Sequence, residues 1–172
     1  AETLFAEGLA AHRAGDCAAA ELSYLRVADD FTEGRYAEAA LYNAALCHQR
    51  AGDRARAKVI YARLVATYPA TRDARHARFQ LAAIAVADEA WQEALVLADA
   101  LLTTELSTDE RMEALVRRNQ ALLGLDRVVL ALEAADGAVR YLRSRPEADP
   151  VDSTYFAAAA QFTLGEAHRR TA

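Results

Sequence analysis

The sequence predicts an all-α fold, a solenoid of antiparallel helix pairs with about four and a half repeats. The chain of 172 residues is 53% hydrophobic and has only 7 Gly and 3 Pro. Much of this apolar content is alanine, which forms helices most readily. The tetrapeptide Arg-Ala-Gly-Asp occurs at residues 13–16 and again at 50–53, an offset of 37. Other residues follow the same offset, and units at one fixed period indicate a repeat architecture.

The second repeat shows the predicted helix pair most clearly. Its first helix is expected over residues 37–50, and Gly52 ends it because glycine tolerates the left-handed conformation of a helix C-cap. Asp53 is a suitable N-cap for the second helix, which is expected to run to about Thr67. Proline at position 69 then prevents its continuation.

The other repeats follow in order within a single predicted domain over residues 1–172. The predicted units span residues 1–34, 37–69, 73–106 and 108–146, with a partial unit at 153–172. Units three and four have Glu89 and Asp126 in place of the turn glycine. Residues 144–152 contain two prolines and predict a longer loop.

The two ends of the array are expected to be unfinished. The fifth unit has a predicted first helix from Thr154 to about Arg170 but no second one. Its outward face is therefore expected to cap imperfectly, to pair with another copy of the chain, or to be covered by further sequence. Ala1 opens directly onto a helical pattern, so we expect the chain to be a piece of a longer protein.

This pattern resembles the tetratricopeptide repeat. That family has a small residue at its eighth position, a glycine turn, an alanine at the twentieth, an aromatic at the twenty-fourth and a terminal proline. The matching residues are Gly8, Gly15, Ala20 and Tyr24 in the first unit, and Ala45, Gly52, Ala57, Tyr61 and Pro69 in the second. The third unit keeps Ala82, Trp91 and Ala94, while the fourth keeps Ala131 but has Asn119 at the small position. The resemblance implies a right-handed superhelix whose first helices line a concave surface, and a role in binding a protein or peptide segment there.

The fifth position of each first helix faces the groove in this family. It is occupied here by Phe5, Tyr42, Phe79, Val116 and Phe162. Next to two of these rings lie Asn43 and Gln80, whose amides can pair with a peptide backbone. The resemblance therefore implies that Phe5, Tyr42 and Phe79 are partly exposed partner contacts, together with the two amides. The alternatives are that the rings fill gaps between adjacent first helices and that the amides form a solvated wall.

The chaperone-tail version of the repeat has a carboxylate clamp, with lysine at the fifth position and asparagine at the ninth. Phe5 and Leu9 stand there instead, so chaperone tails are not expected partners. Arg117, Arg118 and Gln120 are predicted as further partner contacts, because residues 117–120 are the most irregular stretch of the repeats. Arg118 and Asn119 stand there at positions that are apolar or small in other units, and burying them without partners would be costly. The alternatives are that Arg118 and Asn119 pair with Glu113 or Asp136, or that the fourth unit is shifted or distorted.

Several classes of function are not expected from this sequence. The net charge of -5 gives no basic footprint for nucleic acid. No apolar run approaches the roughly 18 residues of a membrane span, so direct membrane insertion is not expected. The histidines His12, His48, His76 and His168 lack metal-binding spacing. We find no nucleophile elbow, phosphate loop or paired catalytic carboxylates. A non-catalytic protein without a cofactor or metal is therefore predicted.

The compartment is predicted from one further resemblance. Residues 67–82 look like the repeats of bacterial envelope proteins, such as the periplasmic partner of the Tol–Pal system and the lipoprotein of the outer-membrane assembly machine. This resemblance implies a periplasmic or envelope-associated protein. The alternatives are a sensor or assembly module of a cytoplasmic regulator, and a self-assembling structural subunit. Cys17 and Cys47 fit no metal motif and are interpreted as two buried thiols, with a disulfide as the alternative.

Overall fold

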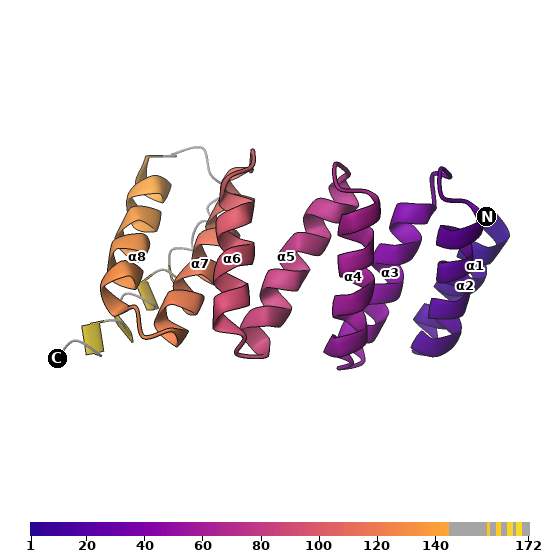
Figure 1. The fold of residues 1–172 in the computed structure, drawn as a ribbon, viewed down its shortest axis with the longest axis horizontal. Helices are drawn as coiled ribbons and strands as arrows, with labels where there is room; N and C mark the ends of the chain where they lie inside the picture. Colours follow the sequence, from indigo (N-terminus) through magenta and orange to yellow (C-terminus); the bar gives the residue numbers. More distant parts are fainter. Residues whose placement is uncertain (145–157, 159–160, 163–164, 167, 170–172) are drawn as a thin grey trace. The chain divides into compact units, whose positions relative to one another are not determined.

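The computed structural model describes residues 1–144, 158, 161–162, 165–166 and 168–169, and its helical elements are drawn in Figure 1. Within this part of the chain the elements are eight α-helices, and no strand occurs. In chain order they are α1 (Glu2–Arg13), α2 (Cys17–Asp30), α3 (Ala37–Arg50), α4 (Arg54–Thr67), α5 (Arg72–Ala87), α6 (Trp91–Leu102), α7 (Thr108–Gly124) and α8 (Val128–Arg143). The prediction of an all-α helical repeat solenoid is confirmed.

One turn geometry recurs within every helix pair, every 37 residues. Its central residues have positive φ: Gly15 at 79°, Gly52 at 86°, Glu89 at 55° and Asp126 at 58°. In the second repeat the Gly52 amide donates to the Gln49 carbonyl (3.1 Å), and the Asp53 amide donates to the His48 carbonyl (2.9 Å). This is the Schellman pattern, which satisfies the last carbonyls of a helix. The third and fourth repeats keep the same turn without glycine.

Polar side chains begin several of the helices, as the sequence predicts for the second repeat. The Asp16 carboxylate accepts the Ala19 amide, and the Asp53 carboxylate accepts the Arg56 amide, both at 3.0 Å. Each side chain thereby satisfies one of the donors that a helix start leaves free. Helix α7 begins with a capping box, in which Ser107 and Glu110 exchange hydrogen bonds of 3.2 and 2.9 Å.

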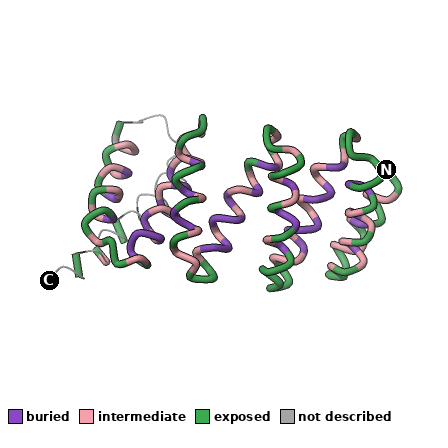
Figure 2. The backbone as a smooth tube through the Cα atoms, viewed as in Figure 1, coloured by how far each residue is buried: buried purple, intermediate pink, exposed green. Residues whose placement is uncertain are grey.

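The first compact unit spans residues 1–81. Within it α1 packs on α2, α2 on α3, and α3 on α4, and α3 is buried along much of its length (Figure 2). Alanines at the contacts allow the helices to approach closely, and Tyr24 and Tyr61 fill the space between them. At Gly8 a Cβ would lie 2.7 Å from the Tyr24 ring, so the small residue predicted there is needed for packing.

The second compact unit spans residues 82–172. Here α7 packs between α6 and α8, around a core that includes Ala94, Leu122 and Ala131. A Cβ at Gly124 would lie 2.2 Å from the Trp91 ring, so the end of α7 also depends on a small residue. The boundary between the two units falls within α5.

Most of the predicted fifth unit lies outside the described residues. The predicted loop at 144–152 falls there except for Ser144, and so does most of the predicted helix from Thr154 to about Arg170. The described residues of that segment are helical, and Phe162 is 68% exposed. Pairing between copies of the chain through this segment stays a prediction.

Candidate functional site

The ring of Phe5 packs on Tyr24 of α2 and on Tyr36, the N-cap residue of α3. It lies 5.5 Å from the ring of Tyr24 and stacks at 5.0 Å on that of Tyr36, measured between centroids. Phe5 is half-buried, because these contacts cover one side of the ring and leave part of it accessible. Gap filling and partner contact are therefore both compatible with its position.

Tyr42 has the corresponding place in the second repeat. Its ring lies 5.7 Å from the ring of Tyr61 on α4 and 6.3 Å from that of His76 on α5. Tyr42 thus joins its own second helix to the next first helix, as the gap-filling interpretation expects. It too is half-buried.

Phe79 differs from the other two rings because it is only 5% exposed. The expectation of a partly exposed Phe79 is wrong. Burial of apolar surface stabilises the fold by about 25 cal/mol for each Å² removed from water, and almost the whole Phe79 ring is buried. A role for Phe79 in partner binding stays a prediction.

The two amides predicted beside the rings are in different situations. Gln80 Oε1 accepts a hydrogen bond from Gln49 Nε2 at 2.9 Å, and Gln49 Oε1 in turn accepts the Tyr61 hydroxyl at 3.0 Å. Gln80 therefore closes a chain of hydrogen bonds within the protein. Asn43 instead lines an open pocket between α1 and α3.

Arg117 and Arg118 each pair with a carboxylate inside the second compact unit. Arg117 lies 3.7 Å from Glu113 and donates to Gln120 Oε1 at 3.3 Å. Arg118 donates to Asp99 at 2.6 Å, a partner that the sequence analysis missed. Pairing with Asp136 does not occur among the described residues, because Arg140 takes that carboxylate. A role for Arg117, Arg118 and Gln120 in partner binding stays a prediction.

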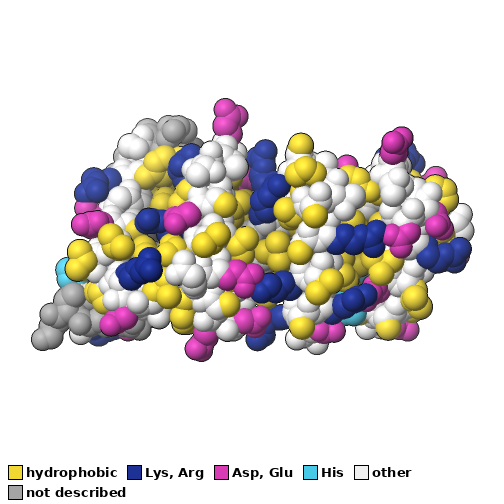
Figure 3. All heavy atoms as spheres, viewed as in Figure 1, with side chains coloured by type: hydrophobic (Ala, Val, Ile, Leu, Met, Phe, Trp, Pro, Cys, Tyr) yellow, Lys and Arg dark blue, Asp and Glu magenta, His cyan; other side chains and the backbone are white. Residues whose placement is uncertain are grey.

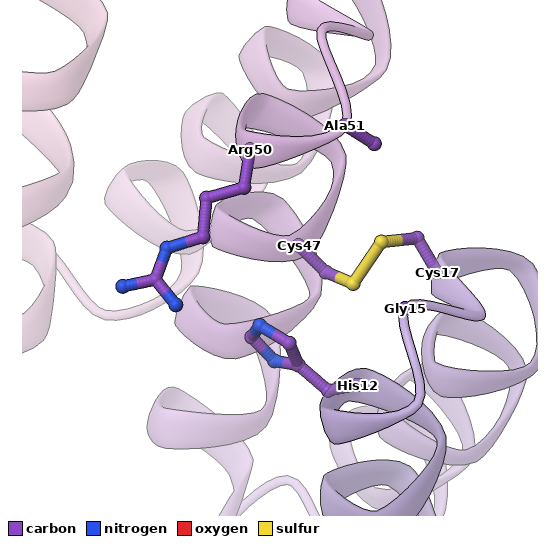
Figure 4. Close-up of a pocket in the computed structure, with 6 residues that line it drawn as sticks. All are labelled: His12, Gly15, Cys17, Cys47, Arg50 and Ala51. Atoms are coloured by element: carbon purple, nitrogen blue, oxygen red, sulfur yellow. A yellow bond between two sulfur atoms is a disulfide. The ribbon is translucent and has the colours of Figure 1, made fainter.

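The structure contains a pocket that the sequence analysis did not foresee. A hollow of about 240 Å³ is lined by His12, Gly15, Cys17, Cys47, Arg50 and Ala51, shown in Figure 4. A neighbouring hollow of about 470 Å³ shares two of these residues and is lined by Leu9, His12, Arg13, Asn43, Leu46 and Arg50. The only signal in the sequence is the repeated tetrapeptide, which places an arginine at the same point of α1 and α3.

A disulfide between Cys17 and Cys47 borders the smaller hollow (Figure 4). The interpretation of two buried thiols is therefore wrong. Cys17 begins α2 and Cys47 lies in the last turn of α3, and the packing of α2 on α3 brings their Cα atoms to 5.5 Å. Because the two residues occupy different repeat positions, the 37-residue offset does not relate them.

His48 belongs to an ion cluster that ties three helices together. Its Nε2 lies 2.6 Å from a carboxylate oxygen of Glu21, and its Nδ1 lies 3.5 Å from a carboxylate oxygen of Asp53. The Arg56 guanidinium also donates to Glu21, at 3.0 and 3.2 Å from Nε. The hydrogen bond from Arg56, ahead of that from His48, holds the pKa of Glu21 below its usual range. These contacts join α2 to α3 and α4, which agrees with a packing role for His48.

An exposed apolar position recurs on the second helices and was also missed. Its members, 37 residues apart, are Leu22 (69% exposed), Val59 (59%) and Val96 (58%). Figure 3 shows apolar side chains among charged ones of both signs on the face of the molecule that it draws. No helix in the described part of the chain is long and apolar enough to cross a membrane. The same residues contain no group of three or more His, Cys, Asp or Glu side chains that could hold a metal ion.

Comparison with known proteins agrees with this architecture. Residues 39–71 match the tetratricopeptide repeat family. Two crystal structures of a Podosopora anserina putative kinesin light chain with nearly identical TPR-like repeats are similar, at TM-scores of 0.69 and 0.68 and 16% identity. They cover 98% of this chain, which covers 84% and 85% of theirs.

A MamA RS-1 double mutant is also similar, with a TM-score of 0.64, 16% identity, and coverage of 99% of this chain and 95% of its own. No curated protein matches the chain. At these identities the solved structures support the fold and not a shared function. Residues 39–71 are a tetratricopeptide repeat, and the chain has the fold of tetratricopeptide-like repeat proteins.

Proposed function

We propose that this chain is a non-catalytic scaffold that binds a protein or peptide segment on the first helices of its repeats. The observation that carries the proposal is the arrangement of α1 and α3, which lie next to each other and enclose an open pocket. Asn43 and the half-buried rings of Phe5 and Tyr42 lie on these helices. Partly exposed aromatic rings beside a polar, accessible amide suit contact with a peptide.

We also propose that the scaffold works in a bacterial envelope compartment. The Cys17–Cys47 disulfide supports this, because disulfides persist in oxidising compartments and are rare in the cytosol. Trapping free thiols in rapidly quenched cells tests it. An envelope protein should contain this disulfide in nearly every copy. Mostly reduced cysteines would favour the alternative, a module of a cytoplasmic regulator.

Site-directed photocrosslinking in the source cells tests the binding function. A photoreactive residue at Asn43 should yield one dominant protein adduct, because this position opens into the pocket between the first helices. The matched position is Arg26 on α2, which is exposed and lines neither hollow. Equal adducts from both positions, or none from Asn43, would contradict the proposal. Adducts only between copies of the chain would favour the self-assembling subunit.

A further inference from the structure

We propose that Arg13 and Arg50 form a binding site for the carboxylate of a partner peptide, in the pocket between α1 and α3. This inference rests on the scaffold function proposed above and adds the chemistry of the ligand. Both arginines line the larger hollow together with His12 and Asn43, so cationic and hydrogen-bonding groups from two helices surround one space. This placement differs from the fifth and ninth positions, where Phe5 and Leu9 stand.

The charge of the pocket is the first argument. The chain as a whole has a net charge of -5, yet the described lining of both hollows contains no aspartate or glutamate. Within the described residues neither arginine forms an ion pair. The aspartates of the two repeated tetrapeptides do not turn to these arginines, because they cap the next helices through the Ala19 and Arg56 amides. The two guanidinium groups are therefore available to an anion.

The fold does not require an arginine at this position. The residues that end α5 and α7 at the equivalent points are Ala87 and Gly124. Both helices nevertheless end in the same turn as α1 and α3. A cation near a helix C-terminus does stabilise it, by about 0.3–1 kcal/mol. This role does not explain why α5 ends in the exposed Ala87, whereas at Gly124 the Trp91 ring leaves no room for a side chain.

His12 supplies the third argument. Its ring reaches from α1 toward α3, with the disulfide on one side and the Arg50 guanidinium on the other (Figure 4). Burial and the charge of Arg50 lower the pKa of His12, which keeps the imidazole neutral at pH 7. Its Nδ1 is buried and has no hydrogen-bond partner in the described part of the protein. His12 lines both hollows, and a neutral imidazole has one donor and one acceptor nitrogen beside the two guanidinium groups.

These features together define the ligand as a carboxylate beside an apolar side chain. A guanidinium presents a planar fork that matches a carboxylate with two parallel hydrogen bonds. Leu9 and Leu46 line the same hollow and provide apolar surface for a neighbouring side chain of the peptide. The occupant is thus an acidic and apolar segment of a partner protein.

The test uses short peptides of defined charge. The probe is acetyl-Glu-Leu-Glu-amide, titrated into the ¹⁵N-labelled chain while the arginine Nε signals and the amides of Leu9, Asn43 and Leu46 are followed by NMR. The first control peptide, acetyl-Gln-Leu-Gln-amide, contains no carboxylate. The second is the same glutamine peptide with a free carboxyl end, so its only carboxylate is the terminal one. Arg13→Ala and Arg50→Ala should each weaken the glutamate peptide roughly tenfold, as expected for one charge-assisted hydrogen-bonding group.

The matched control is Arg26→Ala, which removes the same charge from an exposed site on α2. It should change the affinity less than twofold, and the helical circular dichroism of all three variants should equal that of the wild type. Stronger binding of the free-carboxyl peptide than of the glutamate peptide would support the site and identify a chain end as the ligand. Equal loss in all three variants, or equal binding of the amidated glutamine peptide, would overturn the proposal.

The outcome is separable from that of the photocrosslinking experiment. A specific adduct at Asn43 without any carboxylate preference would leave the scaffold function standing and remove the arginine site. Binding of inorganic phosphate with the same affinity as the glutamate peptide, and with the same response to Arg13→Ala and Arg50→Ala, would show a general anion site. That result would overturn the peptide proposal.

Discussion

Two tyrosines at equivalent repeat positions should respond differently to the same substitution, because only one of their hydroxyls is paired. Tyr24 and Tyr61 lie 37 residues apart and are both fully buried. The Tyr61 hydroxyl donates to Gln49 at 3.0 Å, whereas the Tyr24 hydroxyl has no hydrogen-bond partner among the described residues. The difference arises because His12 occupies in the first repeat the place that Gln49 has in the second.

The magnitudes follow from the cost of burying an unpaired polar group. Tyr61→Phe removes a hydrogen bond and leaves Gln49 Oε1 without that donor, so it should destabilise the protein by about 1–2 kcal/mol. Tyr24→Phe removes a hydroxyl that is already unpaired, so it should be neutral or stabilise by up to about 1–2 kcal/mol. The ring packing is kept in both variants. The difference between them should therefore be about 2 kcal/mol.

Urea denaturation followed by circular dichroism measures both variants against the wild type. For a chain of this size a difference of 1 kcal/mol also corresponds to a Tm change of roughly 2–4 °C. Equal destabilisation by the two substitutions would refute the reasoning, because it would mean that both hydroxyls are paired to the same extent. A double-mutant cycle of Tyr61→Phe with Gln49→Leu provides the control, with Gln80→Leu measured alone because Gln49 also donates to Gln80.

Three further predictions concern stability. Reducing the Cys17–Cys47 disulfide should lower the free energy of unfolding by roughly 3–4 kcal/mol, given the sequence separation of 30, and Cys17→Ala with Cys47→Ala should not respond to reductant. Gly8→Ala should destabilise the fold by about 1–3 kcal/mol, because its Cβ would lie 2.7 Å from the Tyr24 ring. Gly137→Ala in α8 meets no atom within 4 Å and should stabilise the fold by about 0.5–1 kcal/mol. Thermal unfolding of both variants separates the packing cost from the general effect of replacing glycine by alanine in a helix. The pKa of His12 lies below its usual 6.5, so its contribution to the stability of the fold is present above pH 6.5 and is lost as the pH falls through the folded-state pKa. NMR titration of the His12 ring should show that Arg50→Ala raises this pKa. A lower pKa in the variant would contradict the assigned cause.

The helix pairs could be predicted because each depends on local signals. Gly52 and Asp53 specify the end of one helix and the start of the next through the backbone conformation and the side-chain cap that they favour. The 37-residue offset then transfers this turn to the other repeats. The same turn forms even at Glu89 and Asp126, although these residue types do not favour the positive φ that the turn requires. Packing of the neighbouring helices outweighs the small cost of positive φ there.

The candidate site could be predicted only in part, because it depends on contacts between repeats. The position of Phe79 on its helix was clear from the offset, but its 5% exposure depends on everything that packs around α5. Cys17 and Cys47 meet through the packing of α2 on α3, and Arg118 meets Asp99 across two helices of the second unit. No spacing within one repeat reports these contacts. The basic pocket was missed because it forms only where α1 and α3 pack next to each other.

Hydrogen exchange on the complex with a captured partner tests most directly whether the first helices of the repeats bind that partner. The partner identified by crosslinking at Asn43 would be purified and added in excess to the chain. Protection is predicted to increase in α1 and α3, which line the pocket, and to stay unchanged on the exposed side of α2 and α4 around Leu22 and Val59. Added protection confined to α2 and α4 would contradict the account, because the partner would then bind the exposed apolar residues of the second helices.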